Sequence, residues 1–274
     1  MKYFFILGSN PTLSLAELAA VLNNFDRLSL IQTNIAILET NQKIMANIIK
    51  KIGGTIKFGL IHDEINSGDT DEVLTAIAGF AKPESSETKF MFGLSSYGKN
   101  KINIKALAME FKKLLKKFNI NSRWVISREP TLSSVVVEQN KLTTNRGVEI
   151  IIIQFNKKLL LGKTLAVQPF KELSFRDYGR PARDDRSGML PPKLAQIIIN
   201  LSSASLNGTI LDPFCGSGTI ITEAMLMGYQ NIIGADIADK ALQDTKTNIA
   251  WIKSKFQISD SKVQIFNSDA IHIA

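Results

Sequence analysis

Three acidic residues in the C-terminal part of the sequence have the types and spacing of ligands for a nucleoside-containing cofactor. Asp212, Asp236 and Asp269 each follow a short apolar segment, and Asp236 comes 24 residues after Asp212. A carboxylate at that spacing can accept hydrogen bonds from both hydroxyls of a ribose. Asp269, together with Ala270, could meet an adenine amine. Taken singly, each acid is an ordinary strand-end or cap residue, but three at successive strand ends indicate a binding edge.

A glycine loop directly follows the first of these acids. Residues 212–219 read Asp-Pro-Phe-Cys-Gly-Ser-Gly-Thr, with glycines at 216 and 218. Glycine lets the backbone take positive φ values and approach a ligand closely. Gly216 and Gly218 also fit the start of a dinucleotide-binding G-x-G-x-x-G, but Ile221 occupies its last position. Asp212 would repel a pyrophosphate and would suit an ammonium group, such as that of S-adenosylmethionine, so the methyl donor is favoured over a nicotinamide cofactor.

The surrounding pattern supplies the elements that position this loop. An apolar strand ends at Asp212, the loop follows, and apolar residues from Ile220 onward have helical spacing. Strand, tight glycine loop and helix form the opening unit of a doubly wound α/β sheet, and amides at the helix start can hold an anionic group. Two further strands would end near Asp236 and Asp269.

The motif at residues 212–219 resembles the first motif of class I RNA methyltransferases. Arg-Asp-Tyr-Gly-Arg-Pro-Ala-Arg at 176–183 and Ser-Gly-Met-Leu-Pro-Pro-Lys-Leu-Ala-Gln at 187–196 resemble one branch of them, the THUMP-containing tRNA guanosine N2-methyltransferases. The resemblance is close over about residues 176–270 and weaker over the first 165. It implies S-adenosyl-L-methionine as cofactor, tRNA as partner and a cytoplasmic enzyme. With one cysteine and two histidines in the sequence, no metal site is expected. The residues expected to bind the cofactor are Asp212, Phe214, Gly216, Gly218, Asp236, Ile237, Asp269 and Ala270.

The first half of the chain alternates strand-like and helix-like segments, a rhythm typical of α+β layers of ferredoxin type. Ser14 and Glu17 have capping-box spacing at the start of one expected helix. Residues 44–52 predict a second helix, and residues 134–139 predict a strand. The resemblance places a THUMP-like domain at about 50–165 and a ferredoxin-like region before it.

The excess of positive over negative charge lies entirely in this half. Residues 1–165 hold 22 Lys and Arg against 14 Asp and Glu, whereas residues 166–274 hold 11 of each. The expected helix at 103–118 has one apolar face and a lysine-rich face. A solvated face is the alternative, but such faces normally mix both signs, so contact with phosphates is favoured. The residues predicted to bind RNA are Lys105, Lys112, Lys113, Lys116, Arg123, Arg180 and Arg183. The arginines of the segment 168–188 alternate with aspartates, so local ion pairing is the alternative there.

The predicted organisation has three parts: an N-terminal ferredoxin-like and THUMP-like RNA-binding region at 1–165, a linker at 166–188, and an incomplete Rossmann-like methyltransferase domain at 189–274. No apolar run is long enough to span a membrane. One cysteine excludes a disulfide framework. In the resembling family, an Asp or Asn followed by Pro-Pro and an aromatic residue orients the guanine amine, and no such tetrad occurs in this sequence. We therefore expect no catalytic residue in this chain. The enzyme is expected to be truncated on its C-terminal side and inactive alone. A separate chain is one expected source of the missing half of the methyltransferase domain.

Two other functions remain open on this reasoning. The chain could be a tRNA-binding fragment without catalysis, held to tRNA through its N-terminal half. It could also belong to the DNA amino-methyltransferases, which share the first motif.

Overall fold

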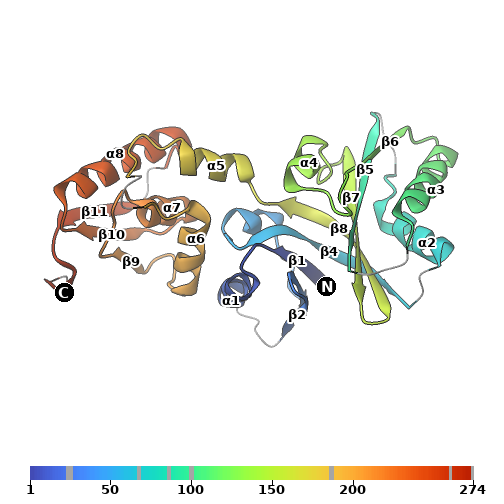
Figure 1. Cartoon of the computed structure of the whole chain (residues 1–274), viewed down its shortest axis with the longest axis horizontal. Coiled ribbons are helices and arrows are strands. Elements are labelled where there is room, and N and C mark those ends of the chain that lie inside the picture. The colour runs from blue at the N-terminus through green and yellow to red at the C-terminus, as the bar shows by residue number, and fades with distance from the viewer. Residues whose placement is uncertain are drawn as a thin grey trace. The chain divides into compact units, whose positions relative to one another are not determined.

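The computed structural model describes residues 1–22, 27–66, 69–84, 88–98, 102–184, 188–258 and 261–272. The chain forms two compact units (Figure 1). The first comprises Met1–Pro11, Asn24–Ile49 and Thr55–Gln168, and the second comprises Thr12–Asn23, Lys50–Gly54 and Pro169–Ala274. Among the described residues, no helix combines the length and apolar character needed to cross a membrane.

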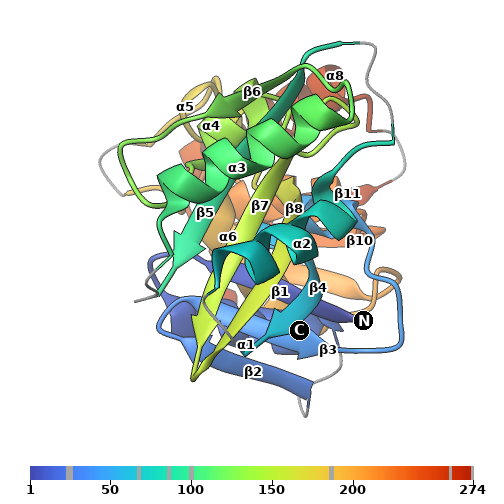
Figure 2. The same cartoon turned by 90° about the vertical axis from the view of Figure 1, so that its right-hand side faces the viewer.

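The first unit is built on an eight-stranded mixed sheet in the order β2-β3-β1-β4-β8-β7-β5-β6. β5 pairs in parallel with β6 and β7, and the other neighbouring pairs are antiparallel. Figure 2 shows α2 and α3 on the same face of this sheet. Between these helices and the sheet lies a core of buried aliphatic and phenylalanine side chains. The elements are β1 (Lys2–Leu7), β2 (Leu28–Gln32), β3 (Ile35–Glu39), β4 (Thr55–Ile65), α2 (Thr70–Ala81), β5 (Phe90–Tyr97), α3 (Ile104–Lys117), β6 (Ser122–Val125), α4 (Ser134–Gln139), β7 (Gly147–Phe155) and β8 (Lys158–Val167).

A buried polar cluster joins four adjacent strands of this sheet, β4, β8, β7 and β5. Glu149 on β7 is fully buried and pairs with the buried Lys57 on β4. Ser95 on β5 and Thr164 on β8 each donate a hydroxyl hydrogen bond to its carboxylate, at 2.6 Å. A one-residue slip of any of these strands would move its side chain to the opposite face and leave a buried charge without its partners, so the cluster fixes the strand register.

The second unit contains a three-stranded parallel sheet in the order β11-β10-β9. One face of this sheet packs on α7 and α8 through a core that includes Ile210, Ile221, Ala224 and Ile232. The elements are α1 (Pro11–Leu22), whose first residue lies in the first unit, α5 (Phe170–Tyr178), α6 (Pro192–Leu201), β9 (Thr209–Asp212), α7 (Thr219–Met227), β10 (Asn231–Asp236), α8 (Asp239–Phe256), β11 (Lys262–Asn267) and the 3₁₀ turn η3 (Ala270–His272). The 3₁₀ turn η2 (Ala46–Lys50) belongs to the first unit except for Lys50. The predicted strand, glycine loop and helix are confirmed.

Three local predictions are wrong. The segment Ser134–Gln139 is a helix and not a strand, because Ser133 caps it by accepting the N–H of Val136, which outweighs the β-propensity of its valines. The helix expected over 44–52 is reduced to the short 3₁₀ turn Ala46–Lys50. The expected capping box does not form, because α1 begins at Pro11, which places Ser14 inside the helix.

The unit boundaries also differ from the expected ones. Most of α1, together with Lys50–Gly54, lies in the second unit, whereas the predicted boundary placed everything up to residue 165 in one region. The fully buried Glu17 on α1 accepts hydrogen bonds from the N–H groups of Gly53 and Gly54, and from Asn200 on α6, each at 2.8 Å. The expected linker at 166–188 contains the helix α5.

Candidate cofactor and RNA-binding sites

The glycine loop connects β9 to α7 within the second unit. Gly216 and Gly218 have φ values of +53° and +82°, the left-handed region in which a side chain is strained. A Cβ at Gly218 would also lie 2.9 Å from the side chain of Thr245. The N–H of Cys215 donates to the carbonyl of Ala235 at 2.9 Å and ties the loop to β10. The loop therefore needs glycine at both positions, as the sequence predicted.

Asp212 is the last residue of β9 and is buried, with 7% of its surface exposed. Its carboxylate accepts the N–H of Phe214 at 3.2 Å. Burial raises the pKa of Asp212, the negative charge of Asp236 adds to the rise, and the Phe214 N–H opposes it. A carboxylate held in this way gains from a cationic ligand group, because an opposite charge offsets the cost of its burial.

Asp236 is the last residue of β10 and organises the loop beside it. One carboxylate oxygen accepts the N–H of Gly216 and the other accepts the N–H of Ala238, both at 3.0 Å. A carboxylate has about four acceptor positions, so two backbone hydrogen bonds leave room for the hydroxyls of a ribose. Asp236 is thus both a loop anchor and a ligand candidate.

The remaining predicted cofactor residues lie around these two acids. Phe214 and Ile237 follow them closely in the chain and are strongly exposed, at 75% and 71%. Exposed apolar side chains at such positions suit packing against an aromatic ring. Asp269 lies two residues beyond β11, is exposed, and accepts the N–H of Ile271 at 3.1 Å, while Ala270 begins η3. Asp269 therefore already has a role as the cap of η3.

Two polar residues of α8 contact the loop and were missed by the sequence reasoning. Thr245 donates its hydroxyl hydrogen to the carbonyl of Gly216 at 2.8 Å. Asn248 donates to the carbonyls of Ser217, at 2.8 Å, and Ala182, at 3.0 Å, and accepts the N–H of Ala182. Both lie on the buried face of the helix. The sequence carried one signal for them. Both are polar residues at positions of α8 where the helical periodicity predicts buried apolar side chains.

The described arginines of the second unit differ in how deeply they are buried. Arg176 is buried and forms a two-pronged ion pair with Glu223 on α7, at 2.6 and 3.1 Å. Arg180 is also buried, with 6% exposed, and donates to the hydroxyl of Thr219 at the start of α7 at 2.6 Å. The prediction that Arg180 binds RNA is therefore wrong, because its guanidinium is enclosed by the protein. Arg183 is half-buried and donates to nearby backbone carbonyls.

The basic face of α3 lies in the first unit and is exposed as predicted. Its buried side carries Leu107, Ala108, Phe111 and Leu115. The exposed cations on α3 and β6 are Lys105, Lys112, Lys113, Lys116, Lys117 and Arg123, and all but Lys117 were predicted to bind RNA. Lys112, Lys113 and Lys116 also line a hollow of about 570 Å³ with Met109 and Ile120. Lys113 pairs with Glu110 at 2.7 Å, so part of the charge on this face is neutralised within the helix.

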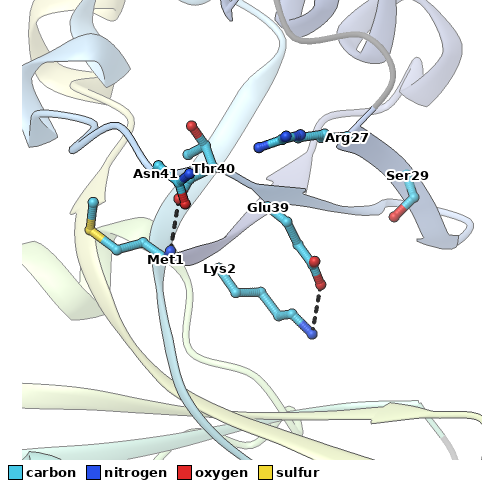
Figure 3. A pocket seen from close by; sticks show the side chains of 7 residues that line it. All are labelled: Met1, Lys2, Arg27, Ser29, Glu39, Thr40 and Asn41. Atoms are coloured by element: carbon cyan, nitrogen blue, oxygen red, sulfur yellow. Dashed lines mark hydrogen bonds and ion pairs between the residues drawn. The ribbon is translucent and has the colours of Figure 1, made fainter.

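A second hollow of the first unit contains none of the predicted site residues. It has a volume of about 670 Å³ and lies at the start of β1. Figure 3 shows that the Met1 amine donates a hydrogen bond to the carbonyl of Thr40 and that Lys2 forms an ion pair with Glu39. The two distances are 2.7 and 2.9 Å. Because these charged groups are already satisfied, the hollow offers no strong anion-binding group apart from Arg27, and we assign it no function.

Comparison with known proteins agrees with this geometry. Residues 180–272 match the family described as RMKL-like, methyltransferase domain. A tRNA (guanine(10)-N2)-dimethyltransferase of Methanothermobacter thermautotrophicus is 32% identical over 146 residues, which are 52% of this chain and 41% of that protein. The chain therefore spans less than half the length of this curated relative.

Two solved structures share the fold. The crystal structure of TrmN from Thermus thermophilus has a TM-score of 0.58 at 16% identity, covering 100% of this chain and 75% of that one. SMU.472, crystallised with SAH, has a TM-score of 0.53 at 14% identity and covers 100% and 76%. At these identities the likeness establishes the fold alone. The resemblance to tRNA guanosine N2-methyltransferases is confirmed by the curated relative, and residues 180–272 are similar to the RMKL-like methyltransferase domain family.

Proposed function

We propose that this chain provides the S-adenosylmethionine-binding and tRNA-binding parts of a tRNA guanine-N2 methyltransferase. One observation carries the proposal. Asp212 and Asp236 lie on either side of the glycine loop, at the C-terminal ends of the adjacent parallel strands β9 and β10. The buried Asp212 suits the ammonium group of the cofactor, Asp236 suits its ribose, and Phe214 and Ile237 suit its adenine. When bound, the cofactor supplies the electrophilic methyl group.

We assign RNA binding to the first unit. The exposed cations of α3 and β6 can neutralise several backbone phosphates without reading base identity. We further propose that this unit combines the ferredoxin-like and THUMP-like regions that the resemblance implies, and that Arg183 contributes from the second unit. The tRNA substrate is supported by the name of the curated relative.

The reaction also needs an acceptor for the proton of the guanine amine. The tetrad that supplies it in the resembling family does not occur in the 274 residues. The proposal therefore assigns to this chain the binding of the methyl donor and of RNA, and assigns the acceptor role to none of its named residues.

Isothermal titration of the purified chain with S-adenosylhomocysteine tests the cofactor assignment, because binding does not depend on the missing acceptor. We expect one site per chain, weakened about ten- to a hundredfold in Asp236→Ala. Crosslinking of the same chain to total cellular nucleic acid tests the substrate, with tRNA as the expected product. Recovery of DNA in place of tRNA would support a DNA amino-methyltransferase and contradict the proposal. Absence of any cofactor binding, with tRNA still recovered, would reduce the chain to a tRNA-binding module.

A further inference from the structure

The side chain of Thr245 on α8 is buried within the second unit, and its hydroxyl points at the glycine loop between β9 and α7. Thr245 has no exposed surface, and its hydroxyl donates to the carbonyl of Gly216 at 2.8 Å. Asn248, one turn later on α8, donates to the carbonyl of Ser217 at 2.8 Å. Both carbonyls that flank the Ser217 N–H along the chain are therefore fixed to the same helix.

This arrangement determines the direction of the Ser217 N–H. The peptide bond between Gly216 and Ser217 is trans, since the described residues contain no cis peptide bond, and a trans peptide directs its C=O and N–H to opposite sides. Because the Gly216 carbonyl points to Thr245, the Ser217 N–H points away from α8. The neighbouring amides are occupied, since Gly216 donates to Asp236 and Gly218 donates to the carbonyl of Cys215. Within the described part of the chain, the Ser217 N–H has no acceptor.

The charges of the ligand indicate what this amide could hold. The amino-acid end of S-adenosylmethionine carries an ammonium and a carboxylate. Asp212 suits the ammonium, but the site also needs a donor for the carboxylate. Ser217 lies one residue before Gly218, the N-cap of α7, where the positive end of the helix dipole favours an anion.

We propose that Thr245 is a positioning residue that aims the Ser217 N–H at the carboxylate of the cofactor, with Asn248 fixing the following peptide in the same way. This inference rests on the proposed function and deepens it. Thr245 touches the loop and not the ligand, so its effect is confined to the part of the ligand that the Ser217 amide holds.

Two ligands that differ in the amino-acid end test the assignment on the full chain. S-adenosylhomocysteine carries the carboxylate, and 5′-methylthioadenosine keeps adenine and ribose but lacks it. Thr245→Val preserves the branched shape and removes the hydroxyl. We expect it to weaken S-adenosylhomocysteine binding about tenfold, the loss that follows from one misdirected charge-assisted hydrogen bond. Binding of 5′-methylthioadenosine should stay unchanged, which also shows that the variant is folded.

The same helix supplies a matched control. Thr247 donates its hydroxyl hydrogen to the carbonyl of Gln243 within α8 and is partly exposed, so Thr247→Val removes a hydroxyl from the same helix without touching the loop. Thr247→Val should bind both ligands normally, and Thr245→Ser, which retains the hydroxyl, should restore S-adenosylhomocysteine binding. Equal losses for the two ligands, or no loss in Thr245→Val, would overturn the role of Thr245. Failure of the unmodified chain to bind either ligand would instead overturn the proposed function, and this role with it.

Discussion

Asp236 is the residue whose removal should affect the cofactor site most directly. Its carboxylate holds the N–H groups of Gly216 and Ala238, each at 3.0 Å, and the proposed function gives its remaining acceptor positions to the ribose. Asp236→Ala removes all of these acceptors at once. A hydrogen bond to a charged group contributes about 1.5–3 kcal/mol, so loss of the ribose contacts should weaken S-adenosylhomocysteine binding about ten- to a hundredfold.

The assay is isothermal titration of the full chain, with a matched variant from the same region. Asp239 lies three residues later, is exposed, and accepts a hydrogen bond from the side chain of Asn267. Asp239→Ala removes the same charge without touching the loop and should leave the affinity unchanged. This comparison separates a local contact from a general change in electrostatic potential.

A pair of smaller ligands separates ribose binding from loop anchoring. Adenosine and 2′,3′-dideoxyadenosine differ only in the hydroxyls that Asp236 is proposed to hold. The unmodified chain should prefer adenosine, and Asp236→Ala should bind both equally weakly. If the variant retains the full preference for adenosine, Asp236 is a loop anchor alone and the ribose assignment is refuted.

Three further predictions concern other parts of the chain. Replacement of Lys112, Lys113 and Lys116 by Glu should weaken tRNA binding and reduce the log–log salt slope by roughly one unit for each phosphate that is no longer neutralised, as measured by filter binding across a salt series; an unchanged slope would mean that these lysines are merely solvated. Burial raises the pKa of Asp212, and its ionised form is the one that attracts an ammonium group, so cofactor affinity should be complete above that pKa and fall as the pH falls through it. Asp212→Asn should flatten this pH dependence in titrations, and an unaltered profile would contradict the assignment. Glu17→Ala removes the acceptor of two buried backbone N–H groups and of the half-buried Asn200 side chain, and should destabilise the second unit by about 2–4 kcal/mol in denaturant unfolding, whereas Glu17→Gln, which retains one oxygen acceptor, should cost less.

The sequence predicted the parts of the fold that depend on local patterns. The strand ending at Asp212, the glycine loop and the amphipathic helix α3 each have a local signature, and all three are present. The helix Ser134–Gln139 was misread because its valines favour a strand, whereas a single serine cap and burial against neighbouring side chains decide the outcome. Helix α5 was hidden in a segment rich in glycine, proline and charge.

The parts that could not be predicted depend on contacts between distant residues. Glu149 appears in the sequence as one acid within an apolar strand, and its partners come from three other strands. Arg180 has the positive charge expected of an RNA-binding residue. Its hydrogen bond to Thr219, however, joins residues 39 positions apart, and only the folded structure shows it. Thr245 carries no motif, because its role depends on the direction of one carbonyl.

The position of Glu17 constrains the order in which the second unit can be completed during synthesis. Its partners Gly53 and Gly54 follow soon after it, but Asn200 is 183 residues further along the chain. Until α6 has left the ribosome, the Asn200 hydrogen bond to this carboxylate cannot form. Contacts of such sequence separation slow folding. An expression fragment that starts at residue 169 would therefore lack α1 and Lys50–Gly54, and would leave Asn200 without its acceptors at Glu17 and Lys51.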